Sequence, residues 1–132
     1  MFRPQQACGL LSYSGIVMKF TDSLKKNRDF QNVYKHGRSR ANKYFIMYIL
    51  ENDRSRNHLG ISVSKKVGNS VVRHRIKRLV LENYRLREEM FNSGLDIAVI
   101  ARPAAKGADF YQVRSAIEHL ASLHGIMQSR EE

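Results

Sequence analysis

The sequence contains very little cysteine and no long apolar run. Cys8 is the single cysteine among the 132 residues, which excludes a disulfide within the chain and fits a reducing compartment. No stretch approaches the roughly 18 consecutive apolar residues of a membrane-spanning helix. The first residues, MFRPQQACGLLSYSGIV, contain one early arginine and a broken apolar run, so they make a poor secretory signal. We therefore expect a cytoplasmic protein without a membrane partner.

Patterns typical of an active site built from protein groups are also missing. Neither G-x-S-x-G nor C-x-x-C occurs, and LGISVSKKVGNS at residues 59–70 lacks the first glycine of a phosphate-binding loop. His119 and His124 are five residues apart on a predicted helix, so they point in different directions and make a poor metal pair. We expect neither a catalytic site nor a metal site formed by the protein alone.

Acidic residues are scarce in the middle of the chain. The net charge is +11, and residues 19–81 hold sixteen of the 23 Lys and Arg residues but only four of the 12 Asp and Glu residues. Between Asp53 and Glu82 there are eight basic residues and no acidic one. This balance indicates a polyanionic partner, either nucleic acid or an anionic membrane. Its uneven placement indicates a surface patch and not a general solubilising coat.

The length and the apolar content predict one folded domain. A chain of 132 residues with 42% hydrophobic residues is long enough to bury a modest core. Recognisable patterning begins near Met18 and Lys19. We expect residues 1–18 to be an extension that is disordered or lies upstream of the true start, residues 19–126 to form the domain, and residues 127–132 to form a tail.

The apolar periodicity predicts the order helix, two strands, helix, strand, helix, which is a single-domain, two-layer α+β sandwich. Thr21, Asp22 and Ser23 are each suitable N-caps for the first helix, and Gly37 is placed to end it. The second strand is expected to run antiparallel to the first, and residues 38–43 to be irregular. The first predicted helix runs from residues 21–23 to about residue 36, the second from about 70 to 90, and the third from about 109 to 124. The predicted strands are 44–51, 59–65 and 95–101.

The first predicted strand is apolar on both faces. Alternation places Tyr44, Ile46 and Tyr48 on one face and Phe45, Met47 and Ile49 on the other. One face is therefore expected to pack on the core, and the other to be covered or to bind a ligand. The next two helices have single apolar stripes at helical spacing. These stripes are Val72, Ile76, Leu79, Val80, Asn83 and Leu86 on one helix, and Phe110, Val113, Ile117, Leu120 and Leu123 on the other.

The segment SKKVGNSVVRHRIKR, residues 64–78, has six Lys or Arg residues and no carboxylate. On the predicted helix Arg73 and Lys77 are four apart, as are His74 and Arg78, so the basic groups repel one another. They crowd the first half of the helix, where the helix dipole is unfavourable to cations. This arrangement costs stability in the free protein, and a bound polyanion removes that cost. The segment therefore predicts a nucleic-acid-binding surface.

Aromatic residues in the basic half of the chain favour RNA over DNA. Phe30, Tyr34, Tyr44 and Tyr48 are able to stack on unpaired bases, each contributing about 1–3 kcal/mol, although the same rings also suit a core. Two other classes of protein stay open at this point. One is a non-catalytic RNA chaperone or ribosomal protein. The other is a DNA-binding regulator with a recognition helix at residues 69–90, which lacks a helix immediately upstream.

The segment GISVSKKVGNSVVRHRIKRLVLENYR, residues 60–85, resembles the signature of the protein subunit of bacterial ribonuclease P. That family has a Ser-Lys-Lys-x-Gly-Asn run leading into Arg-Asn-Arg-x-Lys-Arg on a helix. LKKNRDFQNVYKHGRS at residues 24–39 resembles the first helix of the family, and AVIARPAA at residues 98–105 resembles its last strand. The similarity covers about residues 19–126.

The resemblance implies a fold, an activity and partners. The fold is a small α+β domain with a left-handed β-α-β crossover, against the general right-handed rule. The family protein binds a large catalytic RNA and the 5′ leader of precursor tRNA, and the ribonucleoprotein removes that leader hydrolytically, as an endoribonuclease. Magnesium ions held by the RNA perform the chemistry, so neither a protein-bound cofactor nor an obligate protein partner is expected.

The resemblance also assigns roles to individual residues. His74 departs from the family, which usually has asparagine there, so the contact made at this position stays open; imidazole also donates or accepts a hydrogen bond and protonates readily near phosphates. The residues matching the RNA-binding helix and the paired lysines before it are Lys65, Lys66, Arg73, His74, Arg75, Lys77 and Arg78. The residues matching the leader-binding cleft are Phe30, Tyr34, Ile46 and Tyr48, flanked by Arg73 and Lys77.

Overall fold

The computed structural model describes residues 21–24, 26–52, 56–92 and 94–126. The extension expected over residues 1–18, which includes Cys8, and the tail expected over residues 127–132 lie outside the described residues. The described residues form an α+β fold, as the sequence predicts. None of their helices is long and apolar enough to cross a membrane.

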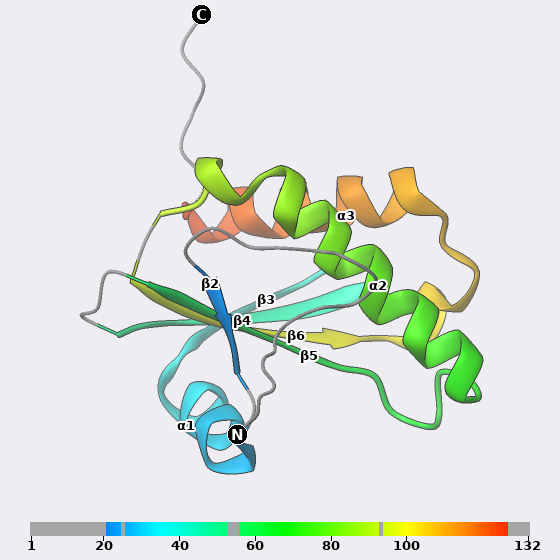
Figure 1. The fold of residues 1–132 in the computed structure, drawn as a ribbon, viewed down its shortest axis with the longest axis horizontal. Helices are drawn as coiled ribbons and strands as arrows, with labels where there is room; N and C mark the ends of the chain where they lie inside the picture. The colour runs from blue at the N-terminus through cyan, green and yellow to red at the C-terminus, as the bar shows by residue number, and fades with distance from the viewer. Residues whose placement is uncertain (1–20, 25, 53–55, 93, 127–132) are drawn as a thin grey trace, which may run out of the picture.

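A five-stranded mixed sheet forms the centre of the fold (Figure 1). Its order is β2-β5-β6-β4-β3, in which β2, β5 and β6 are parallel and β4 is antiparallel to both of its neighbours. The strands are β2 (Thr21–Ser23), β3 (Arg38–Ala41), β4 (Phe45–Glu51), β5 (Asn57–Ser62) and β6 (Leu95–Ala101).

Helices lie on both faces of the sheet. In Figure 1, α2 and α3 lie above the sheet, whereas α1 lies below it. Two short 3-10 helices, η1 and η2, stand directly before and after β6 in the chain. The helices are α1 (Asn27–His36), α2 (Ser70–Leu86), η1 (Glu88–Met90), η2 (Pro103–Gly107) and α3 (Phe110–His124).

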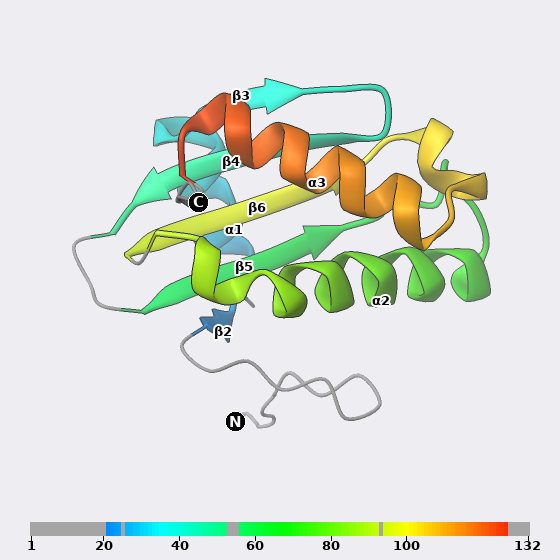
Figure 2. The same ribbon diagram turned by 90° about the horizontal axis from the view of Figure 1, so that it is seen from above.

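The neighbouring parallel strands β5 and β6 are joined through α2 by a left-handed crossover. In Figure 2, which looks down on α2, both strands run from left to right and α2 returns in front of the sheet. β6 lies above β5 in that view, which is to the left of an observer who follows β5 with α2 overhead. A right-handed crossover, the usual arrangement, places the second strand to the right. The handedness implied by the family resemblance is therefore confirmed.

The main hydrophobic core lies between the sheet and the pair of helices α2 and α3. The alternation predicted for β4 is confirmed, because Phe45, Met47 and Ile49 are buried in this core while Ile46 and Tyr48 are half-buried. A smaller second core lies on the face that α1 covers. It consists of Leu24, Val33 and Ala98, with Phe30, Tyr34, Tyr48 and Leu50 packed around it.

α2 buries a wider arc than its predicted stripe. Leu86, in the last turn, is 47% exposed, and Leu81 and Tyr84 are buried in addition to the predicted positions. The Tyr84 hydroxyl lies 2.8 Å from Oγ1 of Thr21 and accepts a hydrogen bond of 3.1 Å from Nδ2 of Asn57. α2 thus packs toward β2 and β5 as well as toward α3, and these contacts decide which positions are buried.

The last turn of α3 also differs from its predicted stripe. Leu123 is 45% exposed, while His124 is buried in its place. Nε2 of His124 makes a hydrogen bond of 2.9 Å with the carbonyl oxygen of Met47 in β4. A polar side chain is therefore accepted in the core because a strand carbonyl is within reach.

The helix caps predicted at residues 21–23 are wrong, because these residues form strand β2. Thr21 is buried, and its hydroxyl donates a hydrogen bond of 2.7 Å to Oε2 of Glu88. α1 begins at Asn27, and its N-cap residue Lys26 makes no side-chain capping bond. Pairing with β5 and the buried contact with Glu88, both distant in sequence, place this segment in the sheet.

The irregular segment predicted over residues 38–43 is wrong for residues 38–41, which form the edge strand β3. A tight turn joins β3 to β4, and Oδ1 of Asn42 accepts the backbone N–H groups of Tyr44 and Phe45 at 3.0 and 2.9 Å. The predicted antiparallel direction of the strands β4 and β5 is right, but β6 lies between them. All four residues of β3 are exposed, so its sequence has no alternation of apolar and polar residues from which a strand is predicted.

Gly37 ends α1 as predicted, but close packing is the reason for a glycine there. Its backbone is extended, with φ of −85°, so the left-handed conformation common at helix ends is not used. A Cβ atom at this position would lie 2.5 Å from the carbonyl oxygen of Val33 and 2.8 Å from that of Ile49. The absence of a side chain lets the end of α1 approach β4.

Candidate nucleic-acid interface

The basic segment predicted from the sequence is presented by the start of α2. Oδ1 of Asn69 accepts the N–H group of Val72 at 3.0 Å and caps the helix, whose first turn contains no acidic residue. We call the six basic residues of this segment the cation strip. Lys65, Lys66, Arg75 and Arg78 are exposed, and Arg73 and Lys77 are half-buried.

No ion pair joins the cation strip to a carboxylate among the described residues. Two of its guanidinium groups are held by backbone carbonyls instead: Arg73 donates to Gly68 at 3.2 Å, and Arg75 donates to Ala108 at 3.0 Å. These bonds orient the cations without neutralising them. The strip is therefore an array of like charges, two of them held in place, that favours an anionic partner.

Arg78, at the end of the strip, has a carboxylate nearby. The pKa of the Glu82 carboxyl is lowered, first by its hydrogen bond with Arg85 and further by the charges of Arg85 and Arg78. Arg78 is therefore partly compensated by Glu82, which reduces the excess charge at this end of the strip. His74 is exposed on the same helix.

Three aromatic rings gather on the α1 face of the sheet, and we call them the ring face. The centroids of Phe30 and Tyr34 are 6.1 Å apart, and those of Tyr34 and Tyr48 are 4.9 Å apart in an edge-to-face arrangement. All three side chains are half-buried, so they are neither core residues nor fully solvated. Val33, which is fully buried, anchors α1 between them.

Gly60 of β5 makes room for the first of these rings. A Cβ atom on Gly60 would lie 2.4 Å from Cζ of Phe30, so the ring rests directly on the strand backbone. Partial burial raises the pKa of the Tyr34 hydroxyl, with a further contribution from Tyr48, while a hydrogen bond with Ser62 opposes this shift. The hydroxyl therefore stays protonated at neutral pH and is able to donate a hydrogen bond.

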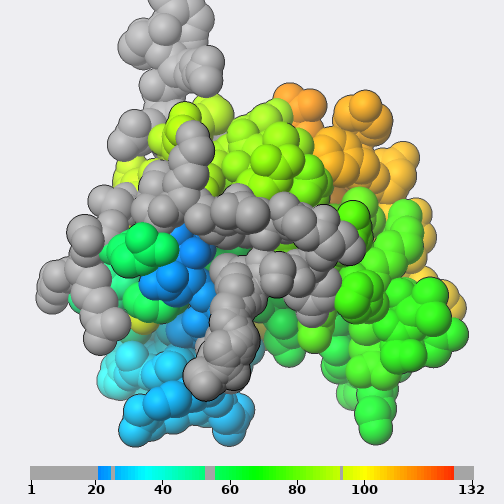
Figure 3. Space-filling view, in the orientation of Figure 1, coloured from blue at the N-terminus to red at the C-terminus, as the bar shows by residue number. Residues whose placement is uncertain are grey.

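Ile46 lies in the next row of the sheet beyond the rings. The register aligns Ile46 of β4 with Ile100 of β6 and Ser62 of β5, and all three side chains are half-buried. β5 leaves the sheet after Ser62 and continues into the segment with Lys65 and Lys66. Figure 3 shows the surface hollowed between α1 and the start of α2. α1, which carries Phe30 and Tyr34, lies on one side of this hollow, and the start of α2, which follows Lys65 and Lys66 in the chain, lies on the other.

Arg73 and Lys77 belong to α2, which lies on the opposite face of the sheet from α1. They therefore do not lie on the ring face, and β5 is the strand that leads from the sheet toward α2. β2 pairs with β5 only at residues 57–59, and no described strand pairs with residues 60–62 on that edge. A ligand is therefore able to pass from the rings to α2 along this open edge.

Tyr44 does not belong to the ring face, and its predicted position beside Ile46 and Tyr48 is wrong. It lies in the turn before β4 and packs on the main core. The ammonium group of Lys43 is 5.5 Å from the centroid of its ring. The alternation of a strand does not extend into a turn, which is why the prediction failed at this residue.

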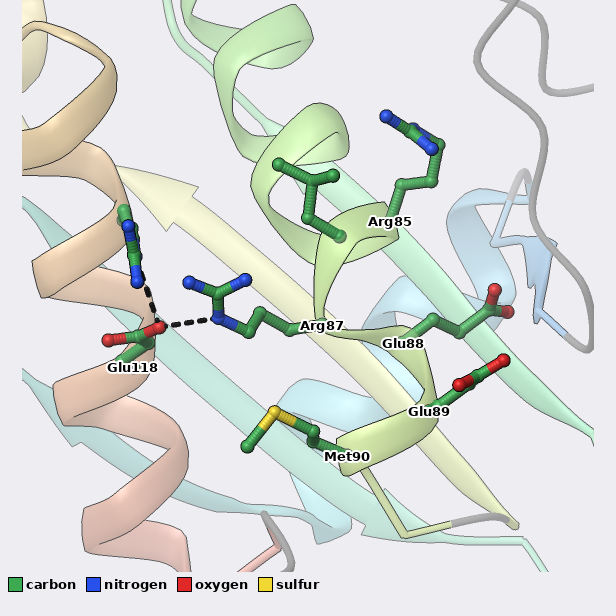
Figure 4. Close-up of a pocket in the computed structure, with 8 residues that line it drawn as sticks. Arg85, Arg87, Glu88, Glu89, Met90 and Glu118 are labelled. Atoms are coloured by element: carbon green, nitrogen blue, oxygen red, sulfur yellow. Dashed lines mark hydrogen bonds and ion pairs between the residues drawn. The ribbon is translucent and has the colours of Figure 1, made fainter. Parts of the chain in front are cut away.

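A cavity of about 590 Å³ lies at the other end of α2 (Figure 4). Arg87 and Glu118 point toward one another there, with 2.7 Å between Nε and Oε2, and Arg114 approaches the same carboxylate at 3.4 Å. The lining contains as many acidic as basic side chains, so it has no excess charge for a polyanion. Its lining residues are Arg85, Leu86, Arg87, Glu88, Glu89, Met90, Arg114 and Glu118.

The described residues contain no cluster of three or more His, Cys, Asp or Glu side chains suited to a metal ion. His119 and His124 lie apart, because His119 is exposed and His124 is buried against β4. Burial lowers the pKa of His124, with smaller contributions from Arg38 and Arg40, against the effect of its bond with Met47. α2 is preceded by β5 and a loop, so the described chain has no helix–turn–helix at this position.

A second cavity, of about 340 Å³, was not anticipated from the sequence. It lies between the β3–β4 turn and α3, two segments about 70 residues apart in the chain, so no local pattern signals it. Its lining residues are Asn42, Lys43, Tyr44, Gln112, Ser115, Ala116 and His119. We call it the hairpin pocket.

Comparison with known proteins points to a single family. The model of the family described as Ribonuclease P matches residues 18–124. The ribonuclease P protein component of Lachnoclostridium phytofermentans is 57% identical over 111 residues, which cover 84% of this chain and 96% of that protein. The corresponding protein of Alkaliphilus metalliredigens is 50% identical over 103 residues, which cover 78% of this chain and 93% of that protein.

Solved structures agree with this result. The RNase P protein of Staphylococcus aureus superimposes with a TM-score of 0.75 at 40% identity, over 80% of this chain and 97% of that one. The RNase P protein of Thermotoga maritima superimposes with a TM-score of 0.72 at 32% identity, over 77% of this chain and 96% of that one.

Proposed function

We propose that this chain, which belongs to the ribonuclease P family and is a protein component of that tRNA-processing enzyme, binds RNA through two adjoining surfaces. The cation strip binds the catalytic RNA. The ring face and the hollow beside it bind the 5′ leader of precursor tRNA. The complex then removes the leader by endonucleolytic hydrolysis to leave the mature 5′ end.

The observation that supports RNA binding most directly is the charge of the cation strip, which makes no ion pair with a described carboxylate. Cations held on a capped helix without carboxylate partners repel one another until phosphates approach them. If about six phosphates are neutralised, the logarithm of the association constant should fall with the logarithm of salt concentration at a slope of roughly −4 to −5. A shallower slope would mean that fewer of these cations contact phosphates.

The ring face suits a single-stranded leader. Half-buried rings keep one part packed on the sheet and offer the remainder to a ligand. Stacking of an unpaired base on such a ring contributes about 1–3 kcal/mol and tolerates different bases. The substrate and the product of this cleavage differ in the attachment of the leader, so contacts at the ring face discriminate between them.

The protein contributes binding, and the RNA contributes the chemistry. Hydrolysis of the phosphodiester at the leader junction requires an activated water and stabilisation of the developing negative charge, which magnesium ions held by the catalytic RNA supply. The cation strip lowers the repulsion between substrate RNA and catalytic RNA. The two RNAs therefore approach, and the ions bind, at lower magnesium concentration.

Reconstitution at low magnesium tests this function. The protein is added to its cognate catalytic RNA with precursor tRNAs whose leaders vary from none to about ten nucleotides. We expect processing to depend on the protein at low magnesium, and affinity for precursor tRNA to rise with leader length until the hollow is filled. Affinity that does not depend on the leader would indicate a general RNA-binding protein and would contradict the proposed leader site.

A further inference from the structure

The hairpin pocket is a preformed cavity between two elements that are tied together. Nδ2 of Asn42 donates to the carbonyl oxygen of Ala116 at 3.1 Å, and it lies 3.5 Å from Nδ1 of His119. The carbonyl oxygen of Asn42 in turn accepts from Arg102 at 3.0 Å. The turn is therefore fixed to α3 before any ligand arrives, which reduces the entropic cost of binding.

The lining of the pocket suits an anionic ligand with an aromatic part. Its lining residues include Lys43, His119, Ser115 and Gln112, and none of them is Asp or Glu. The half-buried ring of Tyr44 adds an aromatic surface. A volume of about 340 Å³ is at the lower end of the range of about 300–1,000 Å³ typical of small-ligand sites.

The carboxylates nearest in sequence to this lining are engaged elsewhere. Oδ1 of Asp109 accepts the N–H group of Gln112 at the start of α3. Glu118 is bonded to Arg87 and Arg114 on the side of α3 that faces α2. Exposed basic residues border the pocket instead, with Arg102 bonded to the turn and Arg40 on β3 two residues before it. The surroundings are therefore cationic.

The hairpin pocket is also separate from the surfaces already described. The sheet order places β3 at one edge and β5, which leads into the cation strip, next to the opposite edge. Figure 2 shows α3 lying over the β3–β4 side of the sheet and α2 over the β5 side. A ligand in the pocket would thus contact the protein independently of the cation strip.

We propose that the hairpin pocket binds one nucleotide of RNA, with a phosphate at Lys43 and His119 and the base against the Tyr44 ring. The inference rests on the proposed RNA-binding function and adds a second docking point, on the β3–β4 side of the fold. Two separate contacts fix the orientation of the protein on its RNA, which a single basic helix does not.

The test uses the variant Lys43→Ala combined with His119→Ala, and, separately, Tyr44→Leu. The control is Arg114→Ala, which removes one cation from the opposite side of the same helix, where Glu118 already neutralises it. Affinity is measured for the catalytic RNA alone and, with the assembled complex, for precursor tRNA, at several salt concentrations. Thermal unfolding of each variant checks that the fold is retained.

We expect the double variant to lose roughly threefold to tenfold in affinity and to reduce the salt slope by about 1, with no change in the control. A loss confined to binding of the catalytic RNA identifies that RNA as the source of the nucleotide, and a loss confined to precursor tRNA identifies the substrate. Tyr44→Leu should lose affinity without a change in slope, whereas Tyr44→Phe, which keeps the ring, should bind as the wild type does.

Unchanged affinity and slope for both RNAs in the double variant would overturn the inference. The proposed function would remain intact in that case, provided that the wild-type protein binds RNA with the steep salt dependence expected of the cation strip. If the wild-type protein binds neither RNA, the proposed function fails together with the inference.

Discussion

Both ends of α2 have basic residues, but the surroundings of these residues are very different. At the first end, Arg73, Arg75 and Lys77 make no ion pair with a described carboxylate. At the second end, Arg85 is paired with Glu82 at 2.6 Å, and Arg87 with Glu118 at 2.7 Å. A docking surface is therefore located by the absence of neighbouring carboxylates and not by a count of basic residues.

The largest expected effect comes from removing three cations at the first end of α2. Replacing Arg73, Arg75 and Lys77 with Ala should weaken binding of the catalytic RNA by roughly 100-fold and reduce the salt slope by about 2 to 3. The measurement is a titration of labelled RNA at several salt concentrations.

The matched control is the triple replacement of Arg85, Arg87 and Arg114 with Ala, which makes the same change in net charge. We expect a loss of less than about threefold, because these cations are already compensated by the protein. Equal losses in the two triple variants would show that only net charge matters and would break the comparison.

The next effect separates the ring face from both ends of α2. Phe30→Ala leaves every cation in place, and it should reduce the preference for precursor over mature tRNA by about 1–2 kcal/mol, as one lost stacking contact predicts. The ratio of the two dissociation constants with the assembled complex measures this preference. Phe30→Leu keeps most of the apolar contact with Gly60, so it separates loss of stacking from loss of packing. Equal discrimination in wild type and both variants would assign Phe30 to the core.

A smaller effect follows from giving the first end of α2 a carboxylate of its own. Val71 is 74% exposed, and Val71→Glu places an acid in the first turn, four residues before Arg75. The helix dipole and this spacing should stabilise the free protein by about 0.3–1 kcal/mol. The same carboxylate should weaken RNA binding severalfold, because it competes with phosphate for Arg75.

Denaturant unfolding and RNA titration of the Val71 variant therefore change in opposite directions. Val71→Gln introduces a side chain of the same shape as glutamate but without the charge. It should change neither the free energy of unfolding nor the RNA affinity appreciably. If Val71→Glu stabilised the protein and left RNA affinity unaltered, the start of α2 would not be the contact surface.

The smallest effect is the acid sensitivity of the compensated end. The lowered pKa of Glu82 means that its pairing stabilises the folded state above the ordinary carboxyl pKa of about 4.3. The contribution is lost as pH falls through the lowered pKa. The free energy of unfolding should therefore fall less between pH 6 and pH 3 in Glu82→Gln than in wild type. A steeper fall in the variant would contradict the sign of this shift.

Much of the fold and part of the site follow from the sequence, for a local reason. The alternation in β4, the capped start of α2 and the buried run of β6 are properties of consecutive residues, which set the face and the period of an element. The cation strip is local in the same sense, because its six basic residues lie within one segment and carboxylates are absent from that segment.

The features that the sequence did not predict depend on partners distant in the chain. Residues 21–23 become a strand only because β5 and Glu88 receive them, and residues 38–41 only because β4 pairs with them. Tyr44 left its expected face because Asn42 bonds the turn to α3. The burial of His124 similarly depends on the carbonyl oxygen of Met47.

The sequence alone was enough to predict the charge of the first half of α2, the residues of β4 that share a face, and membership of the family. Each of these depends on residues that are neighbours along the chain. The tertiary structure alone decided which strands pair, how far the three rings are exposed, which cations are neutralised and that a pocket exists beside α3. The physical reason is that burial and ion pairing depend on distances in space, and folding brings together residues that no local pattern relates.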